Sequence, residues 1–192
     1  MISQSEIKYN RMMEKAKELF FEFGYRATSM DQIAEESGIS KMTIYRYFSS
    51  KEELFIKVVL SVMDEYFRYI MENISKMEGT LEKIDFLLNF ALEHSKVYSL
   101  AFYKDLIDNP YIYDELFREK KKMSRILLED IIRKGMKKGE IRDIDEVFIA
   151  DMLIALIDGA DRDIFTNINS KEDIQDFTKK FYDFLKYGLL GK

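Results

Sequence analysis

The sequence has no cysteine, one proline, one histidine and eight glycines among its 192 residues. Without cysteine the chain has no disulfide framework, no thiolate metal site and no cysteine nucleophile, which fits a reducing compartment. Scarce proline and glycine disfavour a turn-rich sheet protein, and the abundant Lys, Glu, Ile, Leu and Met favour long helices. We therefore expect an all-α fold.

Long apolar runs are missing as well. No segment approaches the ~20 apolar residues that span a bilayer. The first 25 residues alternate charged and apolar side chains at helical spacing, and they lack the apolar core of a signal peptide. We expect a soluble cytoplasmic protein with no membrane partner, and its 47% hydrophobic content suffices for a substantial core.

The residues that usually carry catalysis are few. One histidine, no Gly-rich phosphate loop and no Ser-centred nucleophile motif leave little beyond scattered carboxylates, so we expect no enzyme. The acids of the segment Asp158–Asp163 would point in different directions on a helix, and no loop with calcium-site spacing follows them. We therefore predict no metal and no cofactor.

Charge is distributed unevenly along the chain. The net charge is -5, but residues 1–51 hold eight Lys and Arg against seven Asp and Glu, and residues 52–192 hold 22 against 28. Phosphate binding normally requires a basic footprint, so a nucleic-acid surface on this chain must be local. The segment SGISKMTIYRYFSSKEELF, residues 37–55, carries three cations and no acid before Glu52.

Hydrophobic periodicity and helix caps predict the secondary structure. A first amphipathic helix ends at Gly24. Its apolar stripe consists of Met12, Ala16, Leu19, Phe20 and Phe23. Ser29, Ser40 and Ser50 are placed to cap the next three helices, the first and last with capping-box partners. The predicted helices cover residues 6–23, 30–36, 41–48, 51–76, 80–95, 97–108, 111–138, 144–166 and 171–189.

Two short helices joined by the turn SGIS are typical of a helix-turn-helix. The predicted architecture is an N-terminal three-helix helix-turn-helix domain, residues 1–50, joined by a long helix to a helical C-terminal domain, residues 51–192.

The second short helix has one apolar edge and one displayed face. At 100° per residue Ile44 and Phe48 lie together and can pack on Ile33 and Ala34. An acid-free stretch with aromatics at this spacing is more often ordinary core, but Tyr45 and Arg46 face away from Ile44. The displayed face offers a cation, hydroxyl donors and an apolar side chain, the set that a helix in the major groove requires. Its candidates are Lys41, Met42, Thr43, Tyr45 and Arg46.

Phosphate contacts are predicted at the edges of this face. Lys41 and Lys51 are spaced to straddle the two backbones of the groove, and Tyr47 can add a phenol hydroxyl. Thr28 or Ser29, at the start of the supporting helix, can hydrogen-bond another phosphate.

The chain resembles the DNA-binding module of the TetR family of bacterial transcription regulators over about Met12–Phe55. The matching elements are LFxExGYxxTSMxxIA at Leu19–Ala34, the turn SGIS, and KxTIYRYFxxKEELF at Lys41–Phe55. The resemblance implies groove contacts by Lys41, Met42, Thr43 and Tyr45, and phosphate contacts by Tyr47, Lys51 and the Thr28–Ser29 cap. Two positions depart from the family, because Tyr47 stands where histidine is common and Met42 where a small residue is common.

By the same resemblance, the remaining chain would bind a small-molecule effector and dimerise. The residues expected to line the pocket, unless they only fill the core, are Tyr66, Phe86, Phe90, His94, Phe102, Met123 and Leu127. The segment Phe148–Phe165 is more apolar than one stripe requires, and the last helix has one apolar edge. Two such helices from each chain would pair in a four-helix interface. The residues expected there are Met152, Leu156, Gly159, Ala160, Phe177, Phe181 and Leu185.

The function expected from these observations is a transcriptional repressor. Its homodimer would bind a palindromic operator in double-stranded DNA, and a small molecule of unknown identity would release it. The alternative is a DNA-binding regulator or adaptor of the same fold with no effector.

Overall fold

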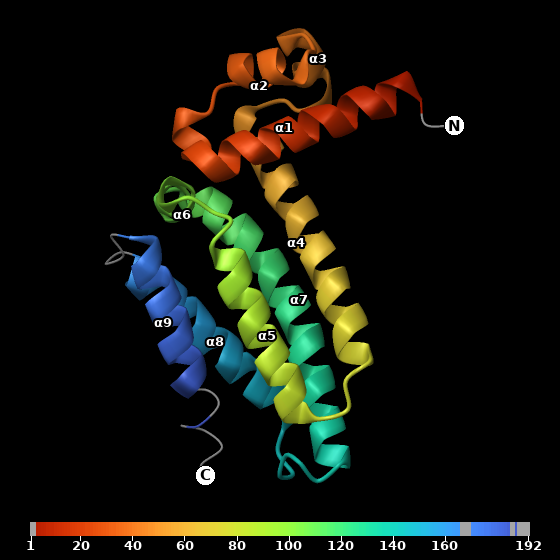
Figure 1. Ribbon diagram of the computed structural model, residues 1–192, viewed down its shortest axis with the longest axis vertical. Helices are drawn as coiled ribbons and strands as arrows, with labels where there is room; N and C mark the ends of the chain where they lie inside the picture. Colours follow the sequence, from red (N-terminus) through yellow and green to blue (C-terminus); the bar gives the residue numbers. More distant parts are fainter. Residues whose placement is uncertain (1–2, 166–169, 185–186, 188–192) are drawn as a thin grey trace. The chain divides into compact units, whose positions relative to one another are not determined.

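The computed structural model describes residues 3–165, 170–184 and 187 (Figure 1). These residues form α helices and no strand, which confirms the all-α prediction. The helices are α1 (Gln4–Ala27), α2 (Met30–Ser37), α3 (Lys41–Tyr47), α4 (Lys51–Ser75), α5 (Thr80–Ser95), α6 (Leu100–Ile107), α7 (Pro110–Lys137), α8 (Glu146–Phe165) and α9 (Lys171–Asp183). No helix in the described ranges is both long and apolar enough to cross a membrane.

Serine side chains begin α2 and α3, as the sequence predicts. The hydroxyl oxygens of Ser29 and Ser40 accept hydrogen bonds from the backbone N–H groups of Gln32 and Thr43, each at 3.1 Å. The side chain of Gln32 does not complete a reciprocal capping box, because it donates to Glu36 at 3.5 Å. Each short helix therefore has its own local start signal.

The start of α4 differs slightly from the predicted capping box. The N–H of Glu53 donates to Ser50 Oγ at 3.0 Å, as expected. The carboxylate of Glu53, however, accepts from the N–H and hydroxyl of Ser49 at 2.6 and 2.7 Å. These bonds lower the pKa of Glu53, which keeps the carboxylate charged at the positive end of the helix dipole.

The first helix continues past its predicted end. Gly24 adopts φ 86° and ψ 174°, which interrupts the helix, and a further turn follows to Ala27. Phe23, predicted on the buried stripe, is 43% exposed, whereas Phe21 is 5% exposed. The reason is tertiary, because Phe21 packs on Tyr98 and Phe102 at centroid distances of 4.7 and 5.3 Å.

The chain forms two compact units. Unit 1 extends to Met63 and includes Tyr98–Leu116, so it holds α1–α3, the first part of α4, α6 and the start of α7. Unit 2 comprises Asp64–Val97 and the chain from Phe117 onwards. The division at residue 50, which the helix pattern of the sequence predicts, stays a prediction.

Unit 1 has a core of aromatic and aliphatic side chains. Phe20 of α1 and Phe55 of α4 are fully buried and meet edge to face at a centroid distance of 5.0 Å. Phe102 of α6 lies 5.7 Å from Phe55 and is 4% exposed. Because one ring from each of three helices meets here, the core fixes α1, α4 and α6 to one another.

A charged cluster closes the end of α1. The carboxylate of Asp105 on α6 is 7% exposed and accepts a 2.7 Å hydrogen bond from the backbone N–H of Arg26. The Arg26 side chain lies 3.4 Å from the same carboxylate and 2.9 Å from Asp108. A Cβ on Gly24 would lie 2.6 Å from Asp105 Oδ2, so the approach of α6 requires glycine there.

Unit 2 is built from α5, α8, α9 and parts of α4 and α7. The helices α5 and α9 pack together, and Arg125 of α7 pairs with Asp151 of α8. The N-cap Gly79 offers no side chain, so Glu140 caps α5 from a distant loop by accepting from Thr80 N–H at 2.7 Å. Figure 1 shows α8 and α9 running next to each other.

The Gly24 corner gives a stability prediction. We expect Gly24→Ala to lower the free energy of unfolding by roughly 1–3 kcal/mol, because alanine is strained at this φ and ψ and its Cβ collides with Asp105. Urea denaturation followed by circular dichroism measures this change. The control is Gly139→Ala, where φ is also positive at 72° but nothing lies within 4 Å of the added Cβ. An equal loss in the two variants would contradict the role of the close contact.

Candidate nucleic-acid interface

The turn between α2 and α3 has the geometry that the SGIS segment predicts. Gly38 ends α2 in the left-handed conformation, with φ 63° and ψ 35°. Its N–H and that of Ile39 donate to carbonyls at the end of α2, and its own carbonyl accepts from Arg11 of α1 at 3.2 Å. The glycine therefore sets the angle between the helices, and α1 holds the turn in place.

The buried edge of α3 is the one that the helical wheel predicts. Ile44 is fully buried and Phe48 is 5% exposed, and Ile33 and Ala34 of α2 are also buried. Phe48 stacks on Tyr9 of α1 at a centroid distance of 6.1 Å. These contacts fix the rotation of α3 about its axis, so the opposite face points to solvent.

The exposed face of α3 carries the predicted groove residues. Met42 is 78% exposed and Tyr45 is 42% exposed, although both are large apolar side chains. Arg46 is exposed too, and Thr43 is half-buried with its hydroxyl 2.8 Å from that of Ser40. The face thus combines a cation, hydroxyls and a flexible thioether on one short helix.

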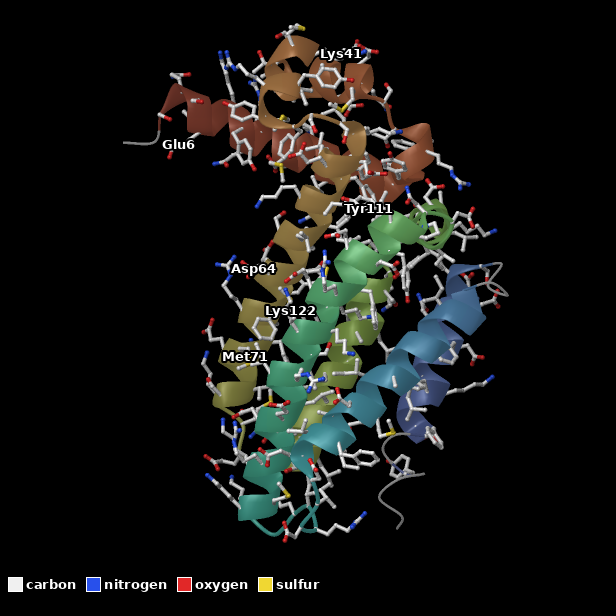
Figure 2. All side chains as sticks on the ribbon, turned by 180° about the vertical axis from the view of Figure 1, so that it is seen from behind. Glu6, Lys41, Asp64, Met71, Tyr111 and Lys122 are labelled. Atoms are coloured by element: carbon white, nitrogen blue, oxygen red, sulfur yellow. The ribbon has the colours of Figure 1, made fainter. Side chains whose placement is uncertain are left out.

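Lys41 lies on the outer surface of the α2–α3 pair, where Figure 2 labels it. Its Nζ donates to the carboxylate of Asp31 on α2 at 2.7 Å. This hydrogen bond raises the pKa of Lys41 above its ordinary value, and the Coulomb attraction of the carboxylate adds to the effect. Lys41 is therefore charged, with an internal acidic partner.

The flanks of this face are tied to other helices. The Tyr47 hydroxyl lies 2.7 Å from Ser5 Oγ, and its ring meets Tyr9 edge to face at 5.3 Å. Ser29 is exposed, and because its oxygen serves as the α2 cap, its hydroxyl proton can still be donated. Both positions remain available in the geometry predicted for phosphate contacts.

Two predicted phosphate contacts need correction. Thr28 is fully buried, and its hydroxyl donates to the carbonyls of Gly24 and Leu19 at 2.8 and 3.2 Å. Lys51 donates from Nζ to the carbonyls of Tyr25 and Thr28 at 2.7 and 2.9 Å.

These two side chains donate to carbonyls around the break at Gly24 and the end of α1 at Ala27, where the last carbonyls of a helix need partners outside it. Lys51 Nζ also lies 4.3 Å from the Tyr25 ring centroid, and burial lowers the pKa of this lysine. Both residues therefore stabilise the end of α1, and their side chains are not free to contact DNA phosphates.

Sequence reasoning missed several residues that shape this surface. Asp31 pairs with Lys41, Ser5 and Tyr9 hold Tyr47, and Arg11 binds the turn. Asp31 was visible as an acid in the first turn of α2, but its distance to Lys41 depends on how α2 and α3 cross. No local pattern predicts the other contacts, because each joins α1 to a residue at least 27 positions away.

In unit 2, four of the predicted pocket residues form one aromatic cluster. His94 stacks on Phe90 at 3.8 Å and meets Tyr66 edge to face at 4.5 Å, and Phe86 lies 6.2 Å from Phe90. Tyr69, which the prediction omitted, stacks on Phe90 at 5.7 Å and is 51% exposed. The cluster joins α4 to α5 and is half-buried.

The other predicted pocket residues lie elsewhere. Phe102 belongs to the core of unit 1, against Phe21, Tyr98 and Phe55, so its assignment to the pocket is corrected. Met123 and Leu127 are half-buried on α7. A groove of about 360 Å³ between α5 and α9 has none of the predicted residues in its lining, which consists of Leu92, Glu93, Lys96, Glu172, Gln175, Asp176 and Lys179.

The predicted dimer residues fall into two groups. On α8, Met152 and Leu156 are each 45% exposed, and Gly159 has open space around it. On α9, Phe177 and Phe181 are half-buried and stack at 5.6 Å. The structure does not describe Leu185, nor the side chains of Ala160 and of the acids in Asp158–Asp163.

Comparison with known proteins identifies the family. The family model for bacterial regulatory proteins of the tetR family matches residues 12–58. The transcriptional regulator YhgD of Bacillus subtilis, an uncharacterised protein of the helix-turn-helix type, is 31% identical over 149 residues, which cover 76% of this chain and 78% of that protein.

Two solved structures share the fold. FadR from Bacillus subtilis, in complex with stearoyl-CoA, has a TM-score of 0.70 at 22% identity, and the match covers 94% of this chain and 99% of the FadR chain. A regulator from Saccharomonospora viridis, in complex with choline, has a TM-score of 0.70 at 24% identity, with coverage of 96% and 97%. Together with the α2–α3 geometry, these similarities show that the chain belongs to the TetR family of bacterial regulatory proteins, and it is a DNA-binding transcriptional regulator rather than an enzyme.

Proposed function

We propose that this regulator is a homodimeric repressor that binds a palindromic operator and is released by a small molecule. The observation that carries the DNA part is the outer face of α3, where Met42 and Tyr45 stay exposed while Ile44 is fully buried. Large apolar side chains held in solvent on a rigidly anchored helix have a physical use if they contact base edges.

The proposed contacts divide by chemistry. Met42, Thr43 and Tyr45 face the bases, where a thioether can contact a thymine methyl group and hydroxyls can bond base edges. Lys41 and Arg46 supply positive charge toward the backbone, and the hydroxyls of Ser29 and Tyr47 add phosphate contacts at the edges. Sequence preference then comes mainly from Met42, Thr43 and Tyr45, because the other four side chains contact the backbone.

The α8 helix supports the proposed dimer. Phe148, Met152 and Leu156 are 57%, 45% and 45% exposed, and their spacing of four residues places them along one side of the helix. Two copies related by a two-fold axis would cover this stripe with itself, because such an interface is self-complementary. The same axis would present two α3 helices to half-sites about 34–36 Å apart or a multiple of that spacing.

The aromatic cluster of Tyr66, Tyr69, Phe86, Phe90 and His94 supports the proposed effector. Half-buried rings with a few polar atoms are typical of small-molecule sites, and His94 Nδ1 lies 2.8 Å from the Phe90 carbonyl, which orients its ring. The structures with stearoyl-CoA and choline indicate that this fold accommodates ligands of very different polarity. An effector would act by binding one conformation more tightly than the other.

The DNA contacts are tested by comparing two lysines of opposite role. We expect Lys41→Ala to weaken binding of any duplex by about three- to tenfold and to reduce its salt dependence, because a phosphate contact is lost. Lys51→Ala should instead lower the free energy of unfolding, because carbonyls at the end of α1 lose a charged donor. Fluorescence anisotropy with labelled duplexes and urea denaturation measure the two effects.

Lys57→Ala is the matched control, since this exposed lysine of α4 lies away from α3 in sequence. Selection from a randomised duplex library extends the test, because Met42→Ala and Thr43→Ala should change the preferred sequence and Lys41→Ala should not. If Lys41→Ala bound DNA as tightly as Lys57→Ala, the proposed surface would be wrong.

The dimer is tested by placing a charge in the α8 stripe. Leu156→Asp should raise the dimer dissociation constant by about a hundredfold or more, because a carboxylate cannot be buried against its own copy without a partner. Analytical ultracentrifugation measures the state of assembly. Ile126→Asp, at a side chain that is 55% exposed on α7, should leave it unchanged. A dimeric Leu156→Asp would place the interface elsewhere.

The effector is tested by thermal denaturation against a panel of metabolites that includes a long-chain acyl-CoA and choline. A ligand at a hundred times its Kd adds about 2.7 kcal/mol of stability, which raises Tm by roughly 5–10 °C. Phe90→Ala should abolish the increase, whereas Leu81→Ala, at an exposed side chain of the same helix, should retain it. No increase from any compound would favour a regulator of this fold without an effector.

A further inference from the structure

Asp31 is an acid on the surface proposed to bind a polyanion. It stands in the first turn of α2, and its side chain is 73% exposed. Its carboxylate accepts a 2.7 Å hydrogen bond from Lys41 Nζ, at the start of α3. The pair thus joins the two helices of the helix-turn-helix across its outer surface.

A carboxylate and a DNA phosphate offer the same kind of charged oxygen acceptor to a lysine. Lys41 is the N-terminal cation of α3, and its bond to Asp31 is formed before any DNA arrives. Moving Lys41 to a phosphate therefore means breaking a bond of the same chemical type. The raised pKa of Lys41 agrees with a pair that is fully ionised in the free protein.

We propose that Asp31 is an internal competitor of the DNA phosphate at Lys41, which limits the affinity for DNA of any sequence and weakens its dependence on salt. The inference rests on the proposed recognition surface, because it requires Lys41 to contact phosphate. It assigns to Asp31 a role in setting the overall affinity for DNA, while the preference among sequences remains with the base contacts of Met42, Thr43 and Tyr45.

The salt dependence follows from counterion release. A lysine that binds a phosphate normally displaces one condensed cation, which contributes a slope of about -0.9 to the plot of log affinity against log salt. When Asp31 gives up Lys41, its own carboxylate is left without a partner and attracts a cation in turn. The net release is smaller, so the wild-type slope is shallower than the number of phosphate contacts implies.

Tyr45 and Glu35 are the neighbouring titratable groups of the Asp31–Lys41 pair. Tyr45 lies close enough to Lys41 to act on it electrostatically, but a neutral phenol does not compete with phosphate. Glu35 lies one turn along α2 from Asp31 and therefore on the same side of the helix. Because Lys41 pairs with Asp31 and not with Glu35, Glu35 serves as a control for charge alone.

The experiment is a double-mutant cycle on the full chain with a labelled duplex of random sequence. Wild type, Asp31→Asn, Lys41→Gln and the double variant are titrated by fluorescence anisotropy from about 50 to 200 mM salt, the range in which phosphate contacts are most visible. Asp31→Asn should bind about two- to fivefold more tightly than wild type, and its slope should be steeper by a part of the ~0.9 that one phosphate contact contributes.

The coupling between the two residues decides the outcome. In the Lys41→Gln background, Asp31→Asn should change affinity no more than Glu35→Gln does in the wild type, because the lysine for which it competes is gone. An equal gain in both backgrounds would reduce Asp31 to a general repulsive charge and overturn the proposal. Asp31→Ser also removes the charge and keeps a polar side chain in the first turn, so it should show the same gain in affinity and replaces Asp31→Asn in the cycle if that variant does not fold.

Failure of the recognition surface itself has a separate signature. If Lys41→Gln bound the duplex as tightly as wild type, Lys41 would make no phosphate contact, and both the surface and the competition would be overturned. If Lys41→Gln weakened binding while Asp31→Asn left it unchanged, the surface would stand and only the competition would be overturned.

Discussion

The C-terminal end of α1, interrupted at Gly24 and finished at Ala27, is the constraint on which unit 1 depends, because its backbone groups need partners outside the helix. The N–H of Arg26 finds the buried carboxylate of Asp105, and the carbonyls of Tyr25 and Thr28 find Lys51. Buried backbone groups are costly when unpaired, so these contacts are required by the fold. The end of one helix is thereby tied to α4 through Lys51 and to α6 through Asp105.

The first half of α1 supports the α2–α3 pair at the other end of unit 1. Tyr9 and Arg11, in the first half of α1, contact Tyr47, Phe48 and the Gly38 carbonyl around α3. At 1.5 Å per residue, the distance along α1 from these residues to Gly24 is about 20 Å. A change in the contacts of α6 with Arg26 would therefore act on the same helix that supports α3.

The electrostatics of the surface explain how an acidic chain can bind DNA. With a net charge of -5 the protein has little general attraction for phosphate. Of the cations near α3, Lys41 pairs with Asp31, Lys51 is held by carbonyls, and Arg46 is exposed. With so few uncommitted cations, we propose that affinity depends on well-placed contacts to bases, which favours selective binding over general binding.

The sequence determined the elements and their local chemistry. The order and type of the helices, the caps at Ser29 and Ser40, the turn at Gly38, and the burial of Ile44 against the exposure of Met42 follow from patterns within a few residues, because helix periodicity and capping are local. Only the tertiary structure decided which charged and aromatic side chains are available to contact DNA or a ligand. Lys51 meets a carbonyl 26 positions away, Phe102 lies under α1 instead of in a pocket, and Asp31 reaches Lys41 across a helix crossing. The role of each of these side chains depends on partners far away in the sequence. Only the packing of whole helices brings such partners into contact, and local patterns in one sequence do not predict that packing.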